Sequence, residues 1–341
     1  MKGFVSSRLH PLANLGLLLV LLLACFCITS FLVMVFNYLF FGVGMQEMGN
    51  VTQHPADYPN GWGVSMLSQG VLLLGGLGGA AMALAALTGN KVADYFMPRR
   101  PVPISWPLLA GLLIIVSLPA MSVLLSWNAS WDLPEWMLMK EEQAKETLKV
   151  LTNFSSPLRF VIGVVVMAVV PAVSEELFFR GVLQRNLVQW AGRHAGIWLA
   201  AAIFSAIHFQ FLGFVPRFVL GLVLGYLYEW SGNIVVPMAA HFAQNAFQLV
   251  LLYNAQHQWT ASEYDPDSTE ILPWYLVLGS MAICAAILWQ LYRQMQQPSA
   301  HELPTQLRTL GGAGVAVRHP NAAPPVARTL SHDGVDTTRA E

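Results

Sequence analysis

Charged residues are scarce in this sequence. Only 11% of its 341 residues are Asp, Glu, Lys or Arg, whereas 55% are hydrophobic, and the mean hydropathy is +0.52. The 18 Lys and Arg residues nearly balance the 19 Asp and Glu residues. The chain therefore has neither the basic field that holds nucleic acid nor the acidic excess of a disordered, solvated chain. This composition is typical of a membrane protein, with no nucleic-acid partner.

Cysteine and the common hydrolase motifs are also lacking. Cys25, Cys27 and Cys284 are the three cysteines, and all lie in apolar runs without a C-x-x-C spacing. They predict neither a disulfide framework nor a thiolate zinc site. The sequence contains no G-x-S-x-G elbow, no H-E-x-x-H zinc motif and no phosphate-binding loop. Serine hydrolases, zincins and P-loop enzymes are therefore excluded on motif grounds.

What the sequence has in abundance is long apolar segments. They lie at 15–41, 64–88, 104–127, 158–173, 197–211, 214–230, 234–253 and 272–291. Most are close to the roughly 20 residues that an α-helix needs to cross a bilayer. We therefore predict an all-α, polytopic membrane helix bundle with about eight transmembrane helices.

Basic residues predict the orientation of this bundle. The loops 42–63 and 254–271 contain no Lys or Arg. The chain ends and loops assigned to the opposite side carry Lys2, Arg8, Lys91, Arg99, Arg100, Arg185, Arg193 and Arg293. Because positive charge accumulates on the cytoplasmic side, both termini are expected in the cytoplasm.

The chain divides into four predicted regions. Residues 1–156 hold the first three spans and an amphipathic helix at 131–153, which is expected to lie on the outer membrane surface with Glu141 paired to Lys145. Residues 157–255 hold spans four to seven and form the expected catalytic core. Residues 256–292 hold the last span. Residues 293–341 are rich in Pro and Gly and are expected to form a disordered cytoplasmic tail.

Ionisable residues cluster at the end of the fourth span. Pro171 is expected to kink the helix and Ser174 to cap a new helical segment. Glu176 and Arg180 are four residues apart, so they share one helix face and can form an ion pair. Glu175 is rotated about 100° away and stays available. An isolated pattern of this kind is also typical of a structural ion-pair patch at a helix end.

Two later spans carry the other polar residues. His208 lies in the fifth predicted span, and His241 and Asn245 lie one turn apart on the seventh. Taken alone, His208 also fits a hydrogen-bonded packing residue, and the His241 and Asn245 pair fits an interhelical hydrogen bond. Small residues around them are assigned to close helix packing, namely Gly213, Gly221, Gly225 and Gly232.

Together these residues favour peptide hydrolysis. Two carboxylates, two imidazoles and one amide on neighbouring spans form a polar pocket that is costly inside a membrane and has no stability rationale. A carboxylate in apolar surroundings can take a proton from water, and imidazole and amide groups can hold that water and stabilise an oxyanion.

The order of the motifs resembles a known family. The motifs are Glu175-Glu176-x-x-x-Arg180, Phe204-x-x-x-His208 and His241-x-x-x-Asn245, with Arg217 and Gly221 between the last two. Over residues 157–253 this series is similar to the CPBP family, the CAAX prenyl proteases and bacteriocin-processing or immunity proteins, also called the ABI family of intramembrane glutamic proteases.

The resemblance implies a role for each matching residue. Glu175 is expected to be the general base that activates a water, and His208 to help position that water. His241 and Asn245 are expected to complete the water site and the oxyanion hole. Arg180 is expected to orient the two glutamates, with Glu176 as its ion-pair partner. No cofactor is implied.

Two alternatives stay open at the level of sequence. A zinc-dependent version of the protease would bind the metal through His208, His241 and a glutamate. A non-enzymatic immunity factor or proton-coupled membrane protein is the alternative from another class, since intramembrane Glu and His also form proton relays. The expected partners are the lipid bilayer and a membrane-anchored peptide or protein substrate, and the expected location is a bacterial inner membrane.

Overall fold

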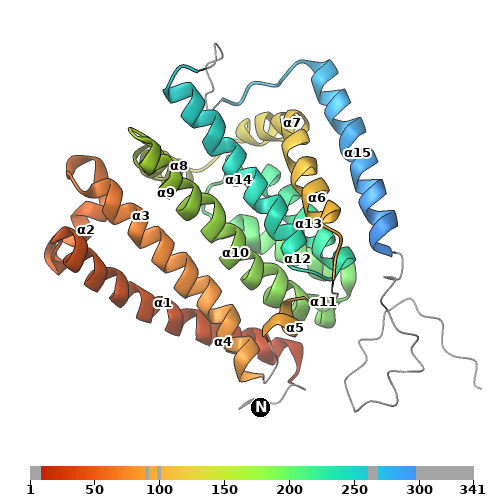
Figure 1. Ribbon diagram of the computed structural model, residues 1–341, viewed down its shortest axis with the longest axis horizontal. Helices are drawn as coiled ribbons and strands as arrows, with labels where there is room; N and C mark the ends of the chain where they lie inside the picture. Colours follow the sequence, from red (N-terminus) through yellow and green to blue (C-terminus); the bar gives the residue numbers. More distant parts are fainter. Residues whose placement is uncertain (1–8, 89–91, 98–100, 260–267, 297–341) are drawn as a thin grey trace, which may run out of the picture. The chain divides into compact units, whose positions relative to one another are not determined.

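The computed structural model is helical throughout the part of the chain that it describes, residues 9–88, 92–97, 101–259 and 268–296 (Figure 1). The α-helices are α1 (Pro11–Phe41), α2 (Met45–Gln53), α3 (Gly61–Leu72), α4 (Gly79–Leu87), α5 (Val92–Phe96), α6 (Ser105–Val116), α7 (Leu118–Ala129), α8 (Glu135–Leu151), α9 (Pro157–Val164), α10 (Val170–Glu176), α11 (Arg185–Ala191), α12 (Arg193–Ala206), α13 (Phe214–Ser231), α14 (Val235–Gln256) and α15 (Trp274–Gln296). A 3₁₀ turn, η1 (Pro55–Asp57), and the π-helical segments η2 (Leu73–Gly78), η3 (Val165–Val169) and η4 (Leu177–Gln184) complete the described elements. The predicted all-α class is confirmed.

Five described helices are long and apolar enough to cross a membrane. They are Pro11–Phe41, Gly61–Leu87, Pro157–Ala191, Val235–Gln256 and Trp274–Met295. A sixth span results if α6 and α7, which meet at a 48° bend, are taken as one broken helix.

The other two predicted spans correspond to α12 and α13. With 14 residues, α12 extends about 21 Å, which is short of the roughly 30 Å hydrocarbon core. The count of eight stays a prediction for this reason. Lys2, Arg8, Lys91, Arg99 and Arg100, on which the predicted orientation depends, lie outside the described residues, as does the predicted tail from residue 297 onward.

The helix that carries the glutamates is longer than predicted. It runs continuously from Pro157 to Ala191, so Pro171 does not end it, and Ser174 is not a cap. The Ser174 hydroxyl donates instead to the carbonyl oxygen of Val170, at 2.7 Å. A proline cannot donate the backbone hydrogen bond of a regular turn, and the π-helical segment η3, which ends at Val169, changes the hydrogen-bond pattern two residues before Pro171. The expectation of a new helix starting at Ser174 is therefore wrong.

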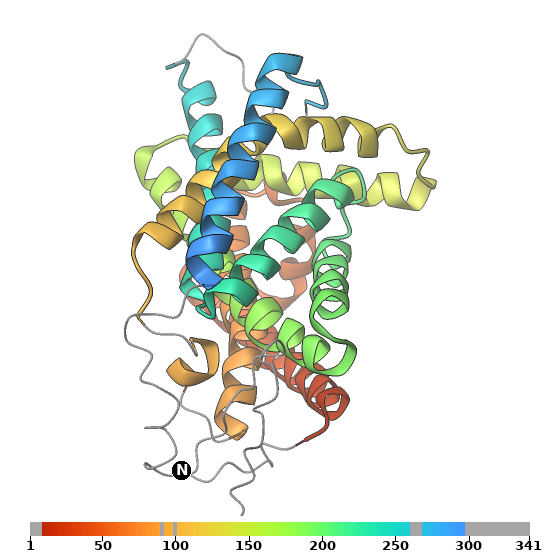
Figure 2. The ribbon, with the colours of Figure 1, turned by 90° about the vertical axis from the view of Figure 1, so that its right-hand side faces the viewer.

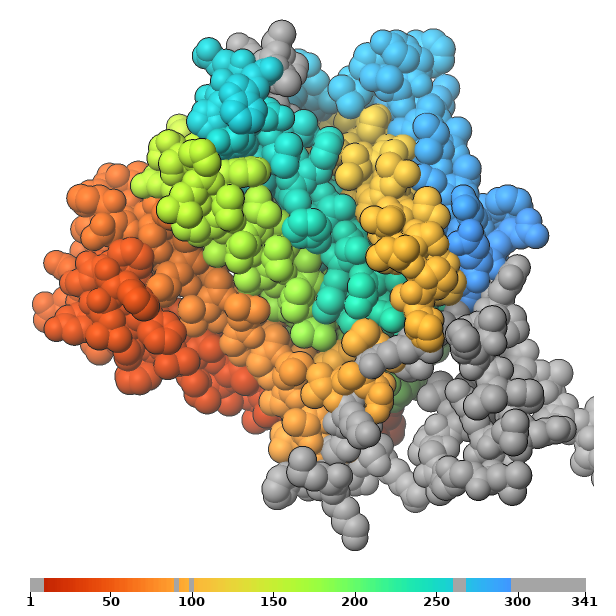
Figure 3. All heavy atoms as spheres, in the orientation of Figure 1, coloured from red at the N-terminus to blue at the C-terminus, as the bar shows by residue number. Residues whose placement is uncertain are grey.

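The bundle has apolar interior clusters and an apolar outer surface. One interior cluster joins α4, η4 and α12, and another joins α6, α13, α14 and α15. Figure 3 shows the face on which α9 and α10, α14 and α6 lie side by side. Large apolar side chains also point outward, for example Phe31 and Phe40 on α1 with 63% and 69% of their surface exposed. Such extensive exposure fits contact with lipid rather than water.

Helices α7 and α8 run across the bundle at one end instead of along it (Figure 2). They are joined by a short turn, and α8 is the amphipathic helix predicted from residues 131–153. Trp127, Trp131 and Trp136 near this turn are exposed. Tryptophan is enriched where a membrane meets water, so this end of the bundle is placed at a membrane surface.

Candidate functional site

Glu176, Arg180 and His241 form a buried ionic cluster. Arg180 Nη1 donates to Glu176 Oε1 at 2.7 Å, which confirms the predicted pair, and both side chains are almost completely buried. His241 Nδ1 lies 2.8 Å from the same Glu176 oxygen. Because an ionised carboxylate only accepts hydrogen bonds, the proton of this contact belongs to Nδ1 of His241. The Nε2 atom of His241 is then free to accept a hydrogen bond.

Glu175 lies on the other side of the same imidazole. Its Oε2 atom is 3.9 Å from His241 Nε2 and has no hydrogen-bond partner among the described residues. A separation of 3.9 Å exceeds that of a direct hydrogen bond but suits two groups that hold one water between them. Among the same residues, Glu176 Oε2 is likewise without a partner, so the two adjacent glutamates differ through Glu176 Oε1, which binds both Arg180 and His241, whereas Glu175 makes no direct hydrogen bond.

The ring of Phe204 is packed against the polar side chains. Its centroid lies 4.5 Å from the Arg180 guanidinium carbon, 5.1 Å from the His208 ring and 6.0 Å from the His241 ring. The ring excludes water from the Arg180 side and provides a cation–π contact in a desolvated setting. The sequence motif gave Phe204 as a spacing residue only, and the structure gives it a place within the cluster.

Helix α13 supplies backbone acceptors to the glutamate helix. Arg180 Nη2 donates to the Gly221 carbonyl at 3.3 Å, and Gln184 Nε2 donates to the Gly225 carbonyl at 3.0 Å. A Cβ atom on Gly225 would lie 2.8 Å from Gln184 Oε1, and one on Gly221 would lie 3.1 Å from Ala201. The predicted packing role is confirmed for these two glycines. Gly232 differs, since it ends α13 with a φ of +59°.

His208 is not inside a helix, contrary to the prediction. Helix α12 ends at Ala206, and His208 lies at the start of the connecting segment 207–213, called here the His208 loop. His208 Nδ1 is 2.7 Å from the carbonyl oxygen of Phe204, so this nitrogen donates and Nε2 accepts. The apolar run continues past Ala206, and for this reason hydropathy alone placed His208 within a span.

Two residues that the sequence did not indicate hold the His208 loop. Asn128 of α7 donates to the Phe211 carbonyl at 3.0 Å and accepts from the Val215 amide at 2.7 Å. Glu141 of α8 accepts from the Leu212 amide at 2.8 Å. Both contacts join elements more than 70 residues apart, and no local pattern reveals them. The expected surface pair of Glu141 with Lys145 is wrong because Glu141 is buried.

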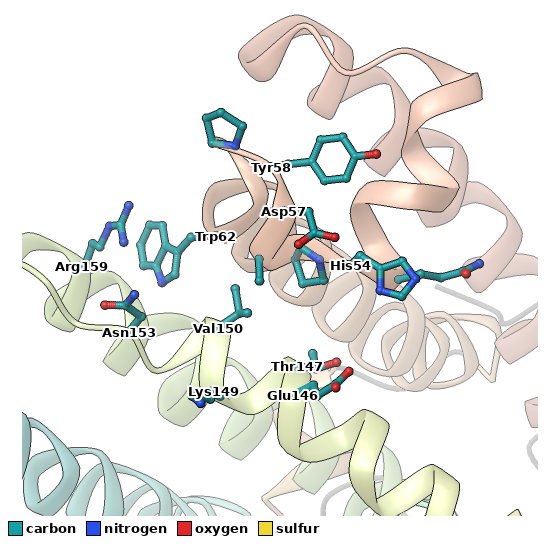
Figure 4. Close-up of a pocket in the computed structure, with 14 residues that line it drawn as sticks. His54, Asp57, Tyr58, Trp62, Glu146, Thr147, Lys149, Val150, Asn153 and Arg159 are labelled. Carbon is teal, nitrogen blue, oxygen red and sulfur yellow. The ribbon is translucent and has the colours of Figure 1, made fainter.

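The same loop borders a cavity of about 440 Å³. It is lined by His208, Phe209 and Gln210 of the loop, by residues of α8, and by Gln69 and Met167. A second cavity of about 520 Å³ lies between the η1 region and α8 (Figure 4). It is lined by Trp62, over which the Arg159 guanidinium stacks at 4.7 Å, and by none of the predicted site residues.

The segment that carries these residues is similar to a known protein family. Residues 157–247 match the family model of type II CAAX prenyl endopeptidase Rce1-like proteins. This segment is an Rce1-like domain. The family resemblance predicted from the motifs is thus confirmed.

The comparisons reach only part of the chain. An uncharacterized protein of Bacillus subtilis (strain 168), YpbD, is 39% identical over 87 residues, which is 24% of this chain. The chain spans 42% of the length of that curated relative. No solved structure matches.

The Rce1-like domain contains all six predicted site residues, but the structure joins only four of them directly. Asn245, one turn beyond His241 on α14, is half-buried, and its amide has no hydrogen-bond partner in the described part of the chain. His208 contacts the cluster through Phe204.

Among the described residues, no three His, Cys, Asp or Glu side chains are grouped as a metal site. The bond of His241 Nδ1 to Glu176 leaves Nε2 as the ring nitrogen that can take another partner.

Proposed function

We propose that this protein is an intramembrane endopeptidase of the CAAX prenyl protease type, in which Glu175 activates a water. The observation that carries the proposal is the 3.9 Å separation of Glu175 Oε2, which has no hydrogen-bond partner among the described residues, and His241 Nε2, the ring nitrogen that does not face Glu176. A water held between them can give a proton to the Glu175 carboxylate while its oxygen attacks a substrate carbonyl carbon. The Rce1-like domain supports the reaction class.

The reaction follows from these positions. The water oxygen bonds to the scissile carbonyl carbon as its proton passes to Glu175, which leaves an oxyanion. His208 and Asn245 are the groups assigned to position the water and to stabilise that oxyanion. The carbon–nitrogen bond then breaks, and the proton held by Glu175 goes to the leaving amine nitrogen. Arg180 donates to Glu176, and Glu176 in turn fixes the tautomer of His241.

The deciding experiment compares the native protein with Glu175→Gln. The probe is a fluorescence-quenched farnesylated CAAX peptide, with an unprenylated transmembrane peptide in parallel, in nanodiscs. Removing a general base should lower kcat by about 10²–10⁴-fold. The melting temperature should change little because Glu175 makes no direct hydrogen bond to another described side chain. Undiminished cleavage by Glu175→Gln, or no cleavage by the native protein, would return the cluster to a structural role.

Further variants and metal analysis separate the alternatives. His208→Ala, His241→Ala and Asn245→Ala should each lower kcat, and their effects should not add because all three act on one water. Stoichiometric zinc that is lost in His241→Ala, or chelator inhibition reversed by zinc, would replace the glutamate mechanism with a metal-dependent one.

The proposal includes a location and an orientation. A bacterial inner membrane with eight spans and cytoplasmic termini is the expected setting, and the substrate is a membrane-anchored peptide or protein. Reporters fused after Arg293 and within 99–103 should report cytoplasm, and one within 55–60 should report the outside. A cytoplasmic signal from the 55–60 reporter would overturn the eight-span arrangement.

A further inference from the structure

Glu141 is the exception among the charged residues of α8. The other Glu and Lys residues of this helix, at 135, 140, 142, 145, 146 and 149, are exposed, whereas only 8% of Glu141 is exposed. Its carboxylate points into the protein and accepts from the Leu212 amide at 2.8 Å. Burying a carboxylate is unfavourable unless it is well hydrogen-bonded. The position of Glu141 therefore needs an explanation that the other glutamates of α8 do not.

The His208 loop is irregular backbone that requires outside support. Phe209 has a φ of +52°, a conformation that is unfavourable for a residue with a side chain. Arg217 donates to both the backbone and the side-chain oxygen of Gln210, at 3.0 and 2.8 Å. Glu141 holds the following part of the loop at Leu212. Glu141 and Arg217, two side chains of opposite charge, therefore hold successive parts of the loop.

The loop and α8 also line the same cavity. His208, Phe209 and Gln210 line the cavity together with Gln143, Thr147 and other residues of α8. Helix α8 thus lines the cavity and also bonds, through Glu141, to the loop that carries His208. A displacement of about 1 Å in a group near a reacting centre can lower a rate by about 100-fold.

We propose that Glu141 is a positioning residue, which fixes the His208 loop and so keeps His208 aligned with the Glu175 and His241 site. The expected effect on kcat rests on the proposed function, whereas the expected effect on loop order rests on the described contacts alone. It makes α8 part of the catalytic architecture, although α8 lies outside the Rce1-like domain.

The first measurement is independent of any substrate. Hydrogen–deuterium exchange of the segment 207–214 is compared in the native protein, Glu141→Ala, Glu141→Gln and the control Glu142→Ala, all in nanodiscs. Glu141→Ala should exchange at least about 10-fold faster because the Leu212 amide loses its acceptor. Glu141→Gln keeps an acceptor oxygen and should stay within about threefold of native. Glu142 is exposed on the same helix, so its variant should match the native protein.

The second measurement is kinetic and uses the farnesylated peptide probe. Glu141→Ala should lower kcat by about 10- to 100-fold with KM within about threefold, and Glu141→Gln should restore most of the rate. Unchanged exchange in Glu141→Ala, faster exchange with an unchanged kcat, or equal effects from Glu142→Ala would each overturn the proposal. If the native protein cleaves no probe, the proposed function fails. The positioning role is refuted separately if segment 207–214 exchanges at the native rate in Glu141→Ala.

Discussion

The two histidines of the site are held in opposite ways. His241 lies inside α14, is 4% exposed, and bonds to Glu176, which pairs with Arg180 one turn along its own helix. His208 lies beyond the end of α12, is half-buried, and belongs to a loop held by side chains from α7, α8 and α13. The first arrangement depends on helix geometry, and the second depends on contacts between distant segments.

The two arrangements should therefore respond differently to substitution. Damage to the ionic cluster leaves a charge unpaired in a low-dielectric interior, which should affect the whole fold. Damage to the loop supports should affect local order and catalysis first, since the loop carries few buried apolar contacts.

Arg180→Ala should be the most damaging substitution. It leaves Glu176 as a buried charge without its cation, and breaking a buried pair costs about 3–5 kcal/mol. The free energy of unfolding in detergent, measured by denaturant titration, gives the loss directly. Glu176→Gln should also lower stability, with residual cleavage. Arg193→Ala is the control because its ion pair with Glu229 is partly exposed and should contribute under about 1 kcal/mol. Equal losses in both Arg variants would contradict a special role for the buried pair.

Asn128→Ala should have the next largest effect. It leaves the Phe211 carbonyl and the Val215 amide without partners, at a cost of about 2 kcal/mol. Exchange of the segment 207–214 should rise as well, which separates loop support from general destabilisation. Ser130, two residues further along, is exposed and bonds only to its own turn, so Ser130→Ala should change neither quantity. A native exchange rate in Asn128→Ala would show that the loop does not depend on this amide.

The same contrast explains what the sequence predicted. The Glu176 and Arg180 pair was predictable because residues four apart on a helix share a face whatever the tertiary structure. The order of the motifs also indicated the family. The position of Ser174 was predicted incorrectly, because proline was taken to end a helix that η3 allows to continue.

The supports of the His208 loop were beyond sequence reasoning. Amphipathic periodicity predicted that α8 has an inner face, but it cannot say which loop packs there. Glu141 was therefore assigned to Lys145 on its own helix instead of to Leu212, 71 residues away. Asn128 gave no signal at all, since a single amide in an apolar segment has no characteristic spacing. Long-range contacts of this kind need the three-dimensional structure.

Gly225→Ala tests the packing that brings α13 against the glutamate helix. The added methyl would lie 2.8 Å from Gln184 Oε1 and 2.9 Å from Ile197 Cγ2, so one of them must move. Overpacking of this kind costs about 1–3 kcal/mol, and the smaller figure is expected because the Gln184 side chain can shift. Gly279→Ala in α15 meets nothing within 4 Å and should stabilise the helix slightly. The measurement is the free energy of unfolding of both variants. A lower value for Gly279→Ala alone would contradict the packing argument.

Phe209→Gly should have the smallest effect, and its sign distinguishes the loop from the helices. The left-handed conformation of Phe209 costs about 1–2 kcal/mol, which glycine avoids. Glycine also gains entropy in the unfolded chain, worth roughly 0.5–1 kcal/mol in the other direction. The net result should be a gain in unfolding free energy of under about 1 kcal/mol. Phe242, an exposed residue inside α14, is the matched control, and Phe242→Gly should lose about 0.5–1 kcal/mol because helical backbone disfavours glycine. Losses of equal size in the two variants would mean that the His208 loop carries no backbone strain, and the contrast between the two histidines would then rest on hydrogen bonding alone.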